Sequence, residues 1–372
     1  MTWRPVLRGG DADRARALVA AIVDELATRA PSGPTLSHGH AGIALLHAYR
    51  ARAGETATGE AAFDCLAQAL DGIAEIPQPW LFHGHAGIAF ALAHLPEVAG
   101  DVEDVLAQLD GLIAQPLAEA RWPYEWELMF GAIGLGVYGL ERGASAIVAR
   151  VVHHLGARAE HEGERVTWRA FDPGDPEGYF NLGIAHGVAG AIAFLAAAIA
   201  TPGARDLLPG AVAWLRARER PGAVPAYPMT EARRVELLTA TVDGWCYGDP
   251  STALAYVRAG AAADEPAWRA AGHALAIRAA RRTDGELAAI GIDDALCHGA
   301  IGRAHLFHRL GLALADDELL ACAARWYDRA LTTVLSRVAV CGLQTGLAGI
   351  GLGLLAGYSA IEPAWDRALL LG

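Results

Sequence analysis

The sequence predicts an all-α protein, a double-layered α/α toroid with seven inner and seven outer helices, formed as one domain over residues 1–372. Three observations predict it. Glycine opens a small-residue, apolar segment seven times, at intervals of 45 to 61 residues, and such a period is typical of repeat architectures. Amphipathic segments alternate with these apolar ones. Hydrophobic residues make up 53% of the chain and charged residues only 19%, which suits a large buried interior.

The inner helices are expected to begin after the opening glycines, which are Gly39, Gly84, Gly131, Gly187, Gly248, Gly299 and Gly346. The segments that follow, such as 41–46 and 347–352, are apolar on nearly all sides. A helix of that kind is buried in an interior. The seven openings therefore place seven inner helices.

The outer helices are expected in segments with one apolar face, at 13–29, 101–119, 145–160, 204–219, 265–281 and 317–337. In the first of these, Leu18, Ile22 and Leu26 share a face at helical spacing. The segment between the first two openings is the least distinct. An outer layer wrapped around an inner ring buries both kinds of helix and leaves no exposed end.

Two connections are long enough to interrupt this alternation. Residues 163–181 are expected to form a loop or short hairpin, and residues 220–243 form broken structure because they contain three prolines. Loops of this length in a compact domain are often functional. Both precede openings that carry reactive side chains.

Charge and cysteine content limit the function classes. A formal net charge of −12 disfavours nucleic acid, because phosphate binding needs a basic face. A helical stretch ends in three arginines, which is typical of a solvated last turn: Arg278, Arg281 and Arg282. Three of the five cysteines have no ligand neighbours and are expected to be buried small residues: Cys65, Cys322 and Cys341.

The same features predict a cytoplasmic protein without a membrane span. The first residues lack the charged and apolar regions of a secretory signal. The longest apolar runs, 188–200 and 347–356, are shorter than the ~20 residues that cross a bilayer. An odd number of cysteines fits a reducing compartment.

Two of the repeat openings carry the strongest chemical pattern. The residue two places before each glycine occupies the same level of the ring, and at neighbouring openings this residue is Cys246 and Cys297, with His298 next to the second. Two thiolates and one imidazole are the donor set of a catalytic zinc with one open position. Because successive residues of a regular helix diverge by ~100°, Cys297 and His298 must lie at a helix start or in a loop to share an ion. The sequence predicts zinc at these three residues.

His186 and Tyr247 are candidates for proton transfer, because both directly precede an opening glycine on the same ring. Histidine, with a pKa near ~6.5, is suited to acid–base work. Two plainer interpretations stay open: a core imidazole bonded to a carbonyl, and a half-buried tyrosine whose hydroxyl is satisfied locally. Four other histidines at the openings are interpreted as caps and ring structure: His38, His40, His83 and His85.

Three motifs, at residues 181–190, 244–250 and 297–299, resemble those of the lanthionine synthetase C family, and the resemblance covers essentially the whole chain. It implies an α/α toroid with seven helices per layer and zinc held by Cys246, Cys297 and His298. The implied reaction adds a cysteine thiol of a dehydrated precursor peptide to dehydroalanine or dehydrobutyrine, which forms lanthionine or methyllanthionine. His186 matches the family's acid–base histidine and Tyr247 its tyrosine. A dehydratase is a candidate partner.

The chain departs from that family at three positions. Glu127 stands where an aspartate is common, so a carboxylate near His186 is kept with one more methylene. Val242 replaces the usual arginine, a charge that only Arg233 or Arg234 from the preceding loop could restore, and Ser251 replaces a common glycine. These changes are expected to preserve zinc binding and to alter proton transfer.

Other functions fit the same donor set. One is addition of a separate thiol such as glutathione to dehydroamino acids. Another is thiol alkylation by a zinc prenyltransferase, which ranks low because those enzymes usually use a carboxylate ligand. A third is a non-catalytic zinc-containing scaffold that binds the precursor peptide, which Val242 and Glu127 favour.

Overall fold

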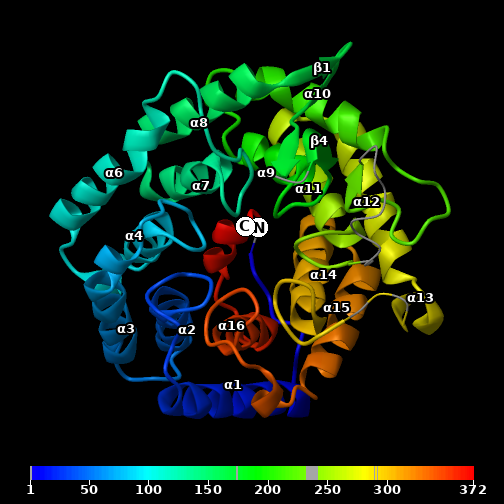
Figure 1. The fold of residues 1–372 in the computed structure, drawn as a ribbon. Helices are drawn as coiled ribbons and strands as arrows, with labels where there is room; N and C mark the ends of the chain where they lie inside the picture. Colours follow the sequence, from blue (N-terminus) through cyan, green and yellow to red (C-terminus); the bar gives the residue numbers. More distant parts are fainter. Residues whose placement is uncertain (1, 173–174, 232–241, 289, 291) are drawn as a thin grey trace. The chain divides into compact units, whose positions relative to one another are not determined.

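Helices form most of the computed structural model, which describes residues 2–172, 175–231, 242–288, 290 and 292–372. The chain divides into two compact units, and Figure 1 colours it from one end to the other. The first unit holds the residues up to Ile113, Asp293–Ala368 and Gly372, and the second holds Ala114–Ile292 and Leu369–Leu371. The single domain expected over the whole chain stays a prediction.

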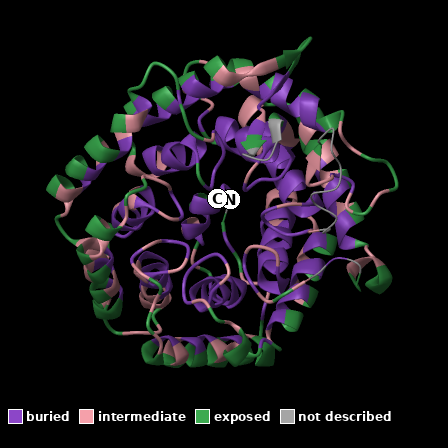
Figure 2. Cartoon of the chain, in the orientation of Figure 1, coloured by how far each residue is buried: buried purple, intermediate pink, exposed green. Residues whose placement is uncertain are grey.

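The first unit contains four apolar helices: α2 (His40–Arg52), α4 (His85–His94), α14 (Ala300–Leu314) and α16 (Leu347–Tyr358). Every residue of α16 is buried, and Figure 2 shows these helices mostly in the buried colour. They pack side by side in the order α14, α16, α2, α4. Glycines and alanines on their surfaces allow this close packing.

Amphipathic helices alternate with these four along the chain. They are α1 (Gly10–Thr28), α3 (Glu60–Asp71), α15 (Asp317–Ala330) and α6 (Glu103–Leu117), the last of which continues into the second unit. Helix α1 buries Ala15, Val19, Ile22 and Leu26 at helical spacing and packs on α16, while α3 packs on α2 and α15 on α14. Shorter helices are α5 (Pro96–Ala99), η1 (Ile73–Glu75), η3 (Leu335–Arg337) and η4 (Ala364–Leu369).

The second unit repeats the pattern with three apolar helices, α7 (Ala132–Arg142), α9 (Val188–Ala197) and α11 (Asp249–Ala263). Their amphipathic partners are α8 (Ser145–Arg158), α10 (Ala204–Arg216) and α12 (Pro266–Ala280), followed by the short α13 (Asp284–Ala288). Helices α7, α9 and α11 pack in that order, and each contacts its own partner helix. The described residues thus contain all seven apolar helices that the opening glycines predict.

Among the described residues of the second unit there are five short strands, three of them within 163–181, where the sequence predicts a loop or hairpin; one strand precedes that segment and one lies in the segment 220–243. Strands β1 (Glu160–Glu162) and β2 (Arg165–Thr167) pair antiparallel, with Glu160 opposite Thr167. Strand β4 (Asp175–Asn181) pairs antiparallel with both β3 (Ala170–Asp172) and β5 (Thr230–Glu231), and Asn181 lies opposite Thr230. The hairpin at 163–181 is confirmed. Of the broken segment 220–243, residues 232–241 lie outside the described part.

Candidate metal centre and proton-transfer residues

Backbone hydrogen bonds connect neighbouring openings at one level, two residues before the opening glycine. In the first unit the Cys297 N–H donates to the Gln344 carbonyl (2.9 Å), that of Gln344 to Ser37 (3.5 Å), and that of Ser37 to Phe82 (2.9 Å). In the second unit the N–H of Ala185 donates to the Cys246 carbonyl (3.3 Å). Each cysteine therefore occupies, within its own unit, the level that the repeat predicts.

The Cys246 turn, residues 243–249, leads into α11 and is held tightly. The buried Trp245 donates its indole N–H to the Leu369 carbonyl (2.9 Å), and the Gly244 N–H donates to the Tyr247 carbonyl (2.7 Å). Gly183 lies against this turn: a Cβ there would sit 2.4 Å from the Cys246 oxygen and 2.5 Å from the Tyr247 ring. Cys246 itself is 8% exposed. The thiol thus belongs to a turn with little freedom to move.

Cys297 and His298 lie immediately before α14 and are half-buried. They precede the helix, so the condition that two adjacent residues can share an ion is met. The Nε2 of His298 lies 2.9 Å from the Oδ2 of Asp293, whose Oδ1 accepts the Ala295 N–H (2.8 Å). Burial raises the pKa of Asp293, but the His298 and Ala295 hydrogen bonds outweigh it and leave that pKa below its usual value. A metal ion would therefore use the Nδ1 of His298.

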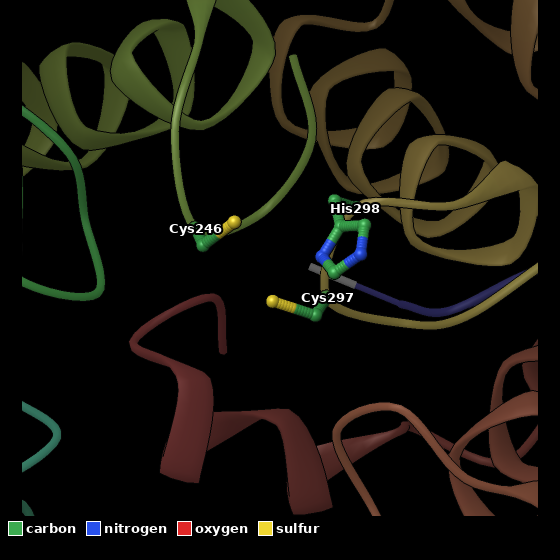
Figure 3. A group of neighbouring side chains, drawn as sticks. All are labelled: Cys246, Cys297 and His298. Carbon is green, nitrogen blue, oxygen red and sulfur yellow. The ribbon is translucent and has the colours of Figure 1, made fainter. Parts of the chain in front are cut away.

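Together Cys246, Cys297 and His298 supply two thiols and one imidazole, a group that could hold a metal ion. Figure 3 draws the three side chains with the segments that carry them. Sulfur and imidazole nitrogen suit zinc, and three protein ligands leave its fourth position open. The donor set therefore fits zinc.

His186 is bound to a carboxylate. Its Nδ1 lies 2.8 Å from the Oε2 of Glu127, and the two Glu127 oxygens also accept the backbone N–H groups of Met129 (3.0 Å) and Phe130 (2.6 Å). Glu127 is 3% exposed, whereas the His186 side chain is 33% exposed. The longer carboxylate at this position therefore still reaches the histidine. The interpretation of His186 as an imidazole bonded to a carbonyl is wrong for this nitrogen.

Aromatic rings flank His186 at the same level of neighbouring openings. Its ring stacks on Phe130 (centroids 5.9 Å apart) and on Tyr247 (6.2 Å). The Tyr247 hydroxyl accepts a hydrogen bond from the side-chain amide of Asn181 (2.9 Å), and the other end of that amide accepts the Gly183 N–H (3.1 Å). Burial raises the pKa of Tyr247, and the Asn181 bond opposes that rise. Tyr247 therefore stays a neutral phenol that can donate a hydrogen bond.

Comparisons with known proteins show the family of this chain and its fold. A family model described as Lanthionine synthetase C-like protein matches residues 30–370, which include every residue of the two groups above. The chain belongs to this family. No curated protein sequence matches it. Among solved structures, nisin cyclase is similar over 96% of this lanthionine synthetase C-like chain and 97% of its own length, with 18% identity and a TM-score of 0.75. That likeness confirms the predicted all-α toroid fold.

In this lanthionine synthetase C-like protein, position 242 carries a valine in place of the arginine that the resemblance implies. Val242 is described and half-buried, while Arg233 and Arg234 lie outside the described residues. Arg282, which we expected in a solvated helix end, has a side chain only 3% exposed and pairs with Asp243 and Asp249. That expectation is wrong for Arg282, because the end of α12 lies against the Cys246 turn and the guanidinium forms ion pairs there with two carboxylates.

The remaining expectations are structural. His85 bonds the Ile76 carbonyl through Nε2 (2.7 Å), and His38 stacks on His83 (5.2 Å). Cys322 and Cys341 are buried as expected, whereas Cys65 is half-buried. Burial raises the pKa of the Cys65 and Cys322 thiols to about 11. Within the described ranges, no helix has the length and apolar character needed to cross a membrane.

Two residues of the site had no predicted role: Asp293, the partner of His298, and Asn181. Asn181 is 3% exposed, ends β4 and holds the Tyr247 hydroxyl. The sequence offered one indication, since Asn181 opens the motif that contains His186. Its partner is 66 residues away, so the pairing depends on the fold.

Proposed function

We propose that this protein is a zinc-dependent lanthipeptide cyclase. It closes thioether rings by adding a cysteine thiol to dehydroalanine or dehydrobutyrine within one dehydrated precursor peptide. Membership of the lanthionine synthetase C-like family and the fold shared with nisin cyclase support a cyclase-type function. The observation that carries the proposal is the donor set itself, two cysteines at one level of the repeat with a histidine beside one of them.

Cys246, Cys297 and His298 would hold the zinc, with Asp293 orienting the imidazole. When bound, zinc would lower the pKa of the substrate thiol and keep it as a thiolate at neutral pH. The burial of Cys246 in a tight turn supports this role, because a fixed ligand presents the open position at a fixed place.

His186 would carry the proton of the reaction. Glu127 accepts the hydrogen of Nδ1, which fixes the tautomer and leaves Nε2 to exchange protons. The proton lost by the thiol passes to Nε2, a carbon–sulfur bond forms at the β-carbon, and the double-bond electrons move onto the α-carbon and carbonyl. Nε2 then returns a proton to the α-carbon, so that atoms and charge balance.

Tyr247 would stabilise the enolate formed in that step. Its hydroxyl accepts from Asn181, so its own hydrogen can donate to the enolate oxygen. A phenol whose pKa is raised by burial keeps this hydrogen at neutral pH. Position 242 carries a valine, so no positive charge from that position would stabilise the enolate. The hydrogen bond from Tyr247 would therefore supply more of that stabilisation.

The substrate partner would be the dehydrated precursor peptide, with a dehydratase as a candidate partner. We place the reaction in the cytoplasm, where a thiolate ligand set stays reduced. No disulfide joins any of the five cysteines, all of which are described.

Ring closure on a dehydrated peptide tests the proposal directly. Zinc-loaded protein should protect the peptide's thiols from alkylation without changing its mass. His186→Ala should keep the zinc and lower the closure rate by about 10²–10⁴, while His161→Ala, an exposed histidine on β1 of the same unit, should change neither. Thiols that stay free with zinc-loaded protein would contradict the proposal.

The same assay separates the other candidate functions. With glutathione present, an adduct mass on the peptide would indicate addition of a separate thiol. Peptide binding with the same number of rings before and after His186→Ala would indicate a scaffold. Metal analysis of the protein accompanies both measurements.

A further inference from the structure

Arg282 connects the two ends of the Cys246 turn. It follows α12, and its guanidinium forms ion pairs with Asp243, where the turn begins, and Asp249, where α11 begins. Cys246 lies three residues from each carboxylate. The side chains of Arg282, Asp243 and Asp249 are 3%, 0% and 1% exposed. One buried arginine thus spans the base of a turn whose centre is a candidate metal ligand.

Both carboxylates also accept hydrogen bonds from backbone N–H groups. The Oδ1 of Asp243 accepts the N–H of Asp249 (2.8 Å). The Asp249 carboxylate accepts the N–H groups of Ala226 (3.0 Å) and Tyr227 (3.3 Å). A shift of either aspartate would therefore break hydrogen bonds as well as an ion pair. This arrangement fixes where the turn begins and where it ends.

The burial of Arg282 excludes a direct part in the reaction. A side chain that is 3% exposed cannot contact a peptide, so Arg282 does not replace the arginine that Val242 lacks. The planar fork of arginine suits two carboxylates at once, whereas a lysine ammonium is a single point charge. The choice of arginine thus matters for geometry more than for charge.

We propose that Arg282 is a positioning residue for Cys246, which holds the thiol at the place where it binds the metal ion. This inference rests on the proposed zinc site. Replacing a residue that orients a metal ligand through a hydrogen bond or ion pair typically lowers metal affinity by about 10–100-fold. The effect should therefore appear in metal binding even where the chain stays folded.

Two replacements of Arg282 are needed to test this. Arg282→Lys keeps the charge and removes the fork. A triple variant, Arg282→Met with Asp243→Asn and Asp249→Asn, removes the whole charged group, since removing the arginine alone would leave two buried carboxylates unpaired. The matched control is Arg218→Lys. Arg218 also bridges two carboxylates of the second unit, Glu162 (2.9 Å) and Glu231 (2.8 Å), but these lie outside the Cys246 turn.

The measurement uses the full chain with zinc alone, by competition with a chelating dye, and with cobalt, whose thiolate absorption reports ligand geometry. Melting of the metal-free protein is recorded alongside. We expect Arg282→Lys and the triple variant to bind zinc about 10–100-fold more weakly with an altered cobalt spectrum. Arg218→Lys should stay within about twofold of the unmodified protein.

Three results would overturn the inference. One is unchanged zinc affinity in both Arg282 variants; if ring closure also persists, the proposed function stands and only the positioning role falls. Another is an equal loss of affinity in Arg218→Lys that follows melting, which would indicate general destabilisation. The third is no metal binding by the unmodified protein, which would overturn the zinc site as well.

Discussion

The two openings that carry the cysteines share a level of the repeat but are built differently. At the opening that carries Cys297, Gly299 has an extended backbone (φ −104°), as do the other opening glycines outside the Cys246 turn. At the second-unit opening, Gly248 has φ +107° and ψ −175°, a conformation essentially reserved for glycine. The regular opening, at residues 297–299, presents two half-buried ligands, and the irregular opening, at residues 246–248, presents a single buried thiol. Gly248 is thus the one opening glycine of the seven that departs from the extended backbone.

Replacing each cysteine tests whether the two openings contribute equally. Cys246→Ala or Cys297→Ala should reduce bound zinc to about a tenth or less and abolish ring closure, because two protein ligands do not make a stable site. Elemental analysis of dialysed protein measures this. Cys341→Ala, a buried thiol of the first unit, is the control and should retain zinc. Full zinc content in Cys297→Ala would remove the regular opening from the site.

Gly248→Ala tests the irregular backbone. A Cβ at this position would lie 2.4 Å from the Asp243 Oδ1 and 2.6 Å from its Cα, in addition to the conformational cost. We expect the free energy of unfolding to fall by about 3 kcal/mol or more, as measured by urea denaturation. Gly10→Ala, where a Cβ would meet nothing within 4 Å, should change it by at most about 1 kcal/mol. Equal stability of the two variants would show that the turn is not strained.

Asp293→Asn tests the support of the regular opening. The asparagine can still accept from His298 but no longer carries the charge that increases the basicity of the imidazole. We expect zinc affinity to fall by about tenfold in a chelator competition. Asp294→Asn, next to it and without a hydrogen bond to His298 among the described contacts, should have no effect. A loss in both variants would point to net charge as the cause.

Acid should weaken α14, the helix that follows the regular opening. Burial lowers the pKa of His308 to about 3, although its bond to the Arg4 carbonyl (2.8 Å) opposes this. Because this pKa lies below the ordinary ~6.5, its stabilising contribution is present above pH 6.5 and is lost as pH falls toward 3. The slope is about 1.4 kcal/mol per pH unit for one group. Melting temperatures from pH 7 to 4 should fall less steeply in His308→Gln, and identical slopes would contradict this.

Much of the fold could be predicted because it is written in local patterns. Each apolar helix begins at the residue after an opening glycine, as with His40 and Leu347, since the glycine period and the apolar run coincide. The amphipathic helix α3 was less distinct, because only Ala62, Leu66 and Ala69 are buried on it. Boundaries that depend on packing were less certain, and α15 ends at Ala330 rather than at residue 337.

The candidate site divides in the same way. The level of Cys246 and Cys297 follows from the repeat, and His186 from its place beside Cys246 on the ring. The residues that hold these side chains in place could not be predicted in this way. Asn181, Arg282 and Asp293 act through contacts that local sequence patterns do not encode. Arg282 shows this most clearly: its sequence context is that of a solvated helix end, and its environment is a buried pair of carboxylates.

The hydrogen bonds that connect neighbouring openings have a consequence for engineering. Cys297, Gln344 and Ser37 are joined by backbone N–H to carbonyl hydrogen bonds, which do not depend on the side chain at each position. A third sulfur introduced by Gln344→Cys would stand at the same level of the repeat as Cys297, at the neighbouring opening. The buried Ser37 hydroxyl donates to the Gln344 amide oxygen, so moving a ligand along this row would require both side chains to be redesigned together.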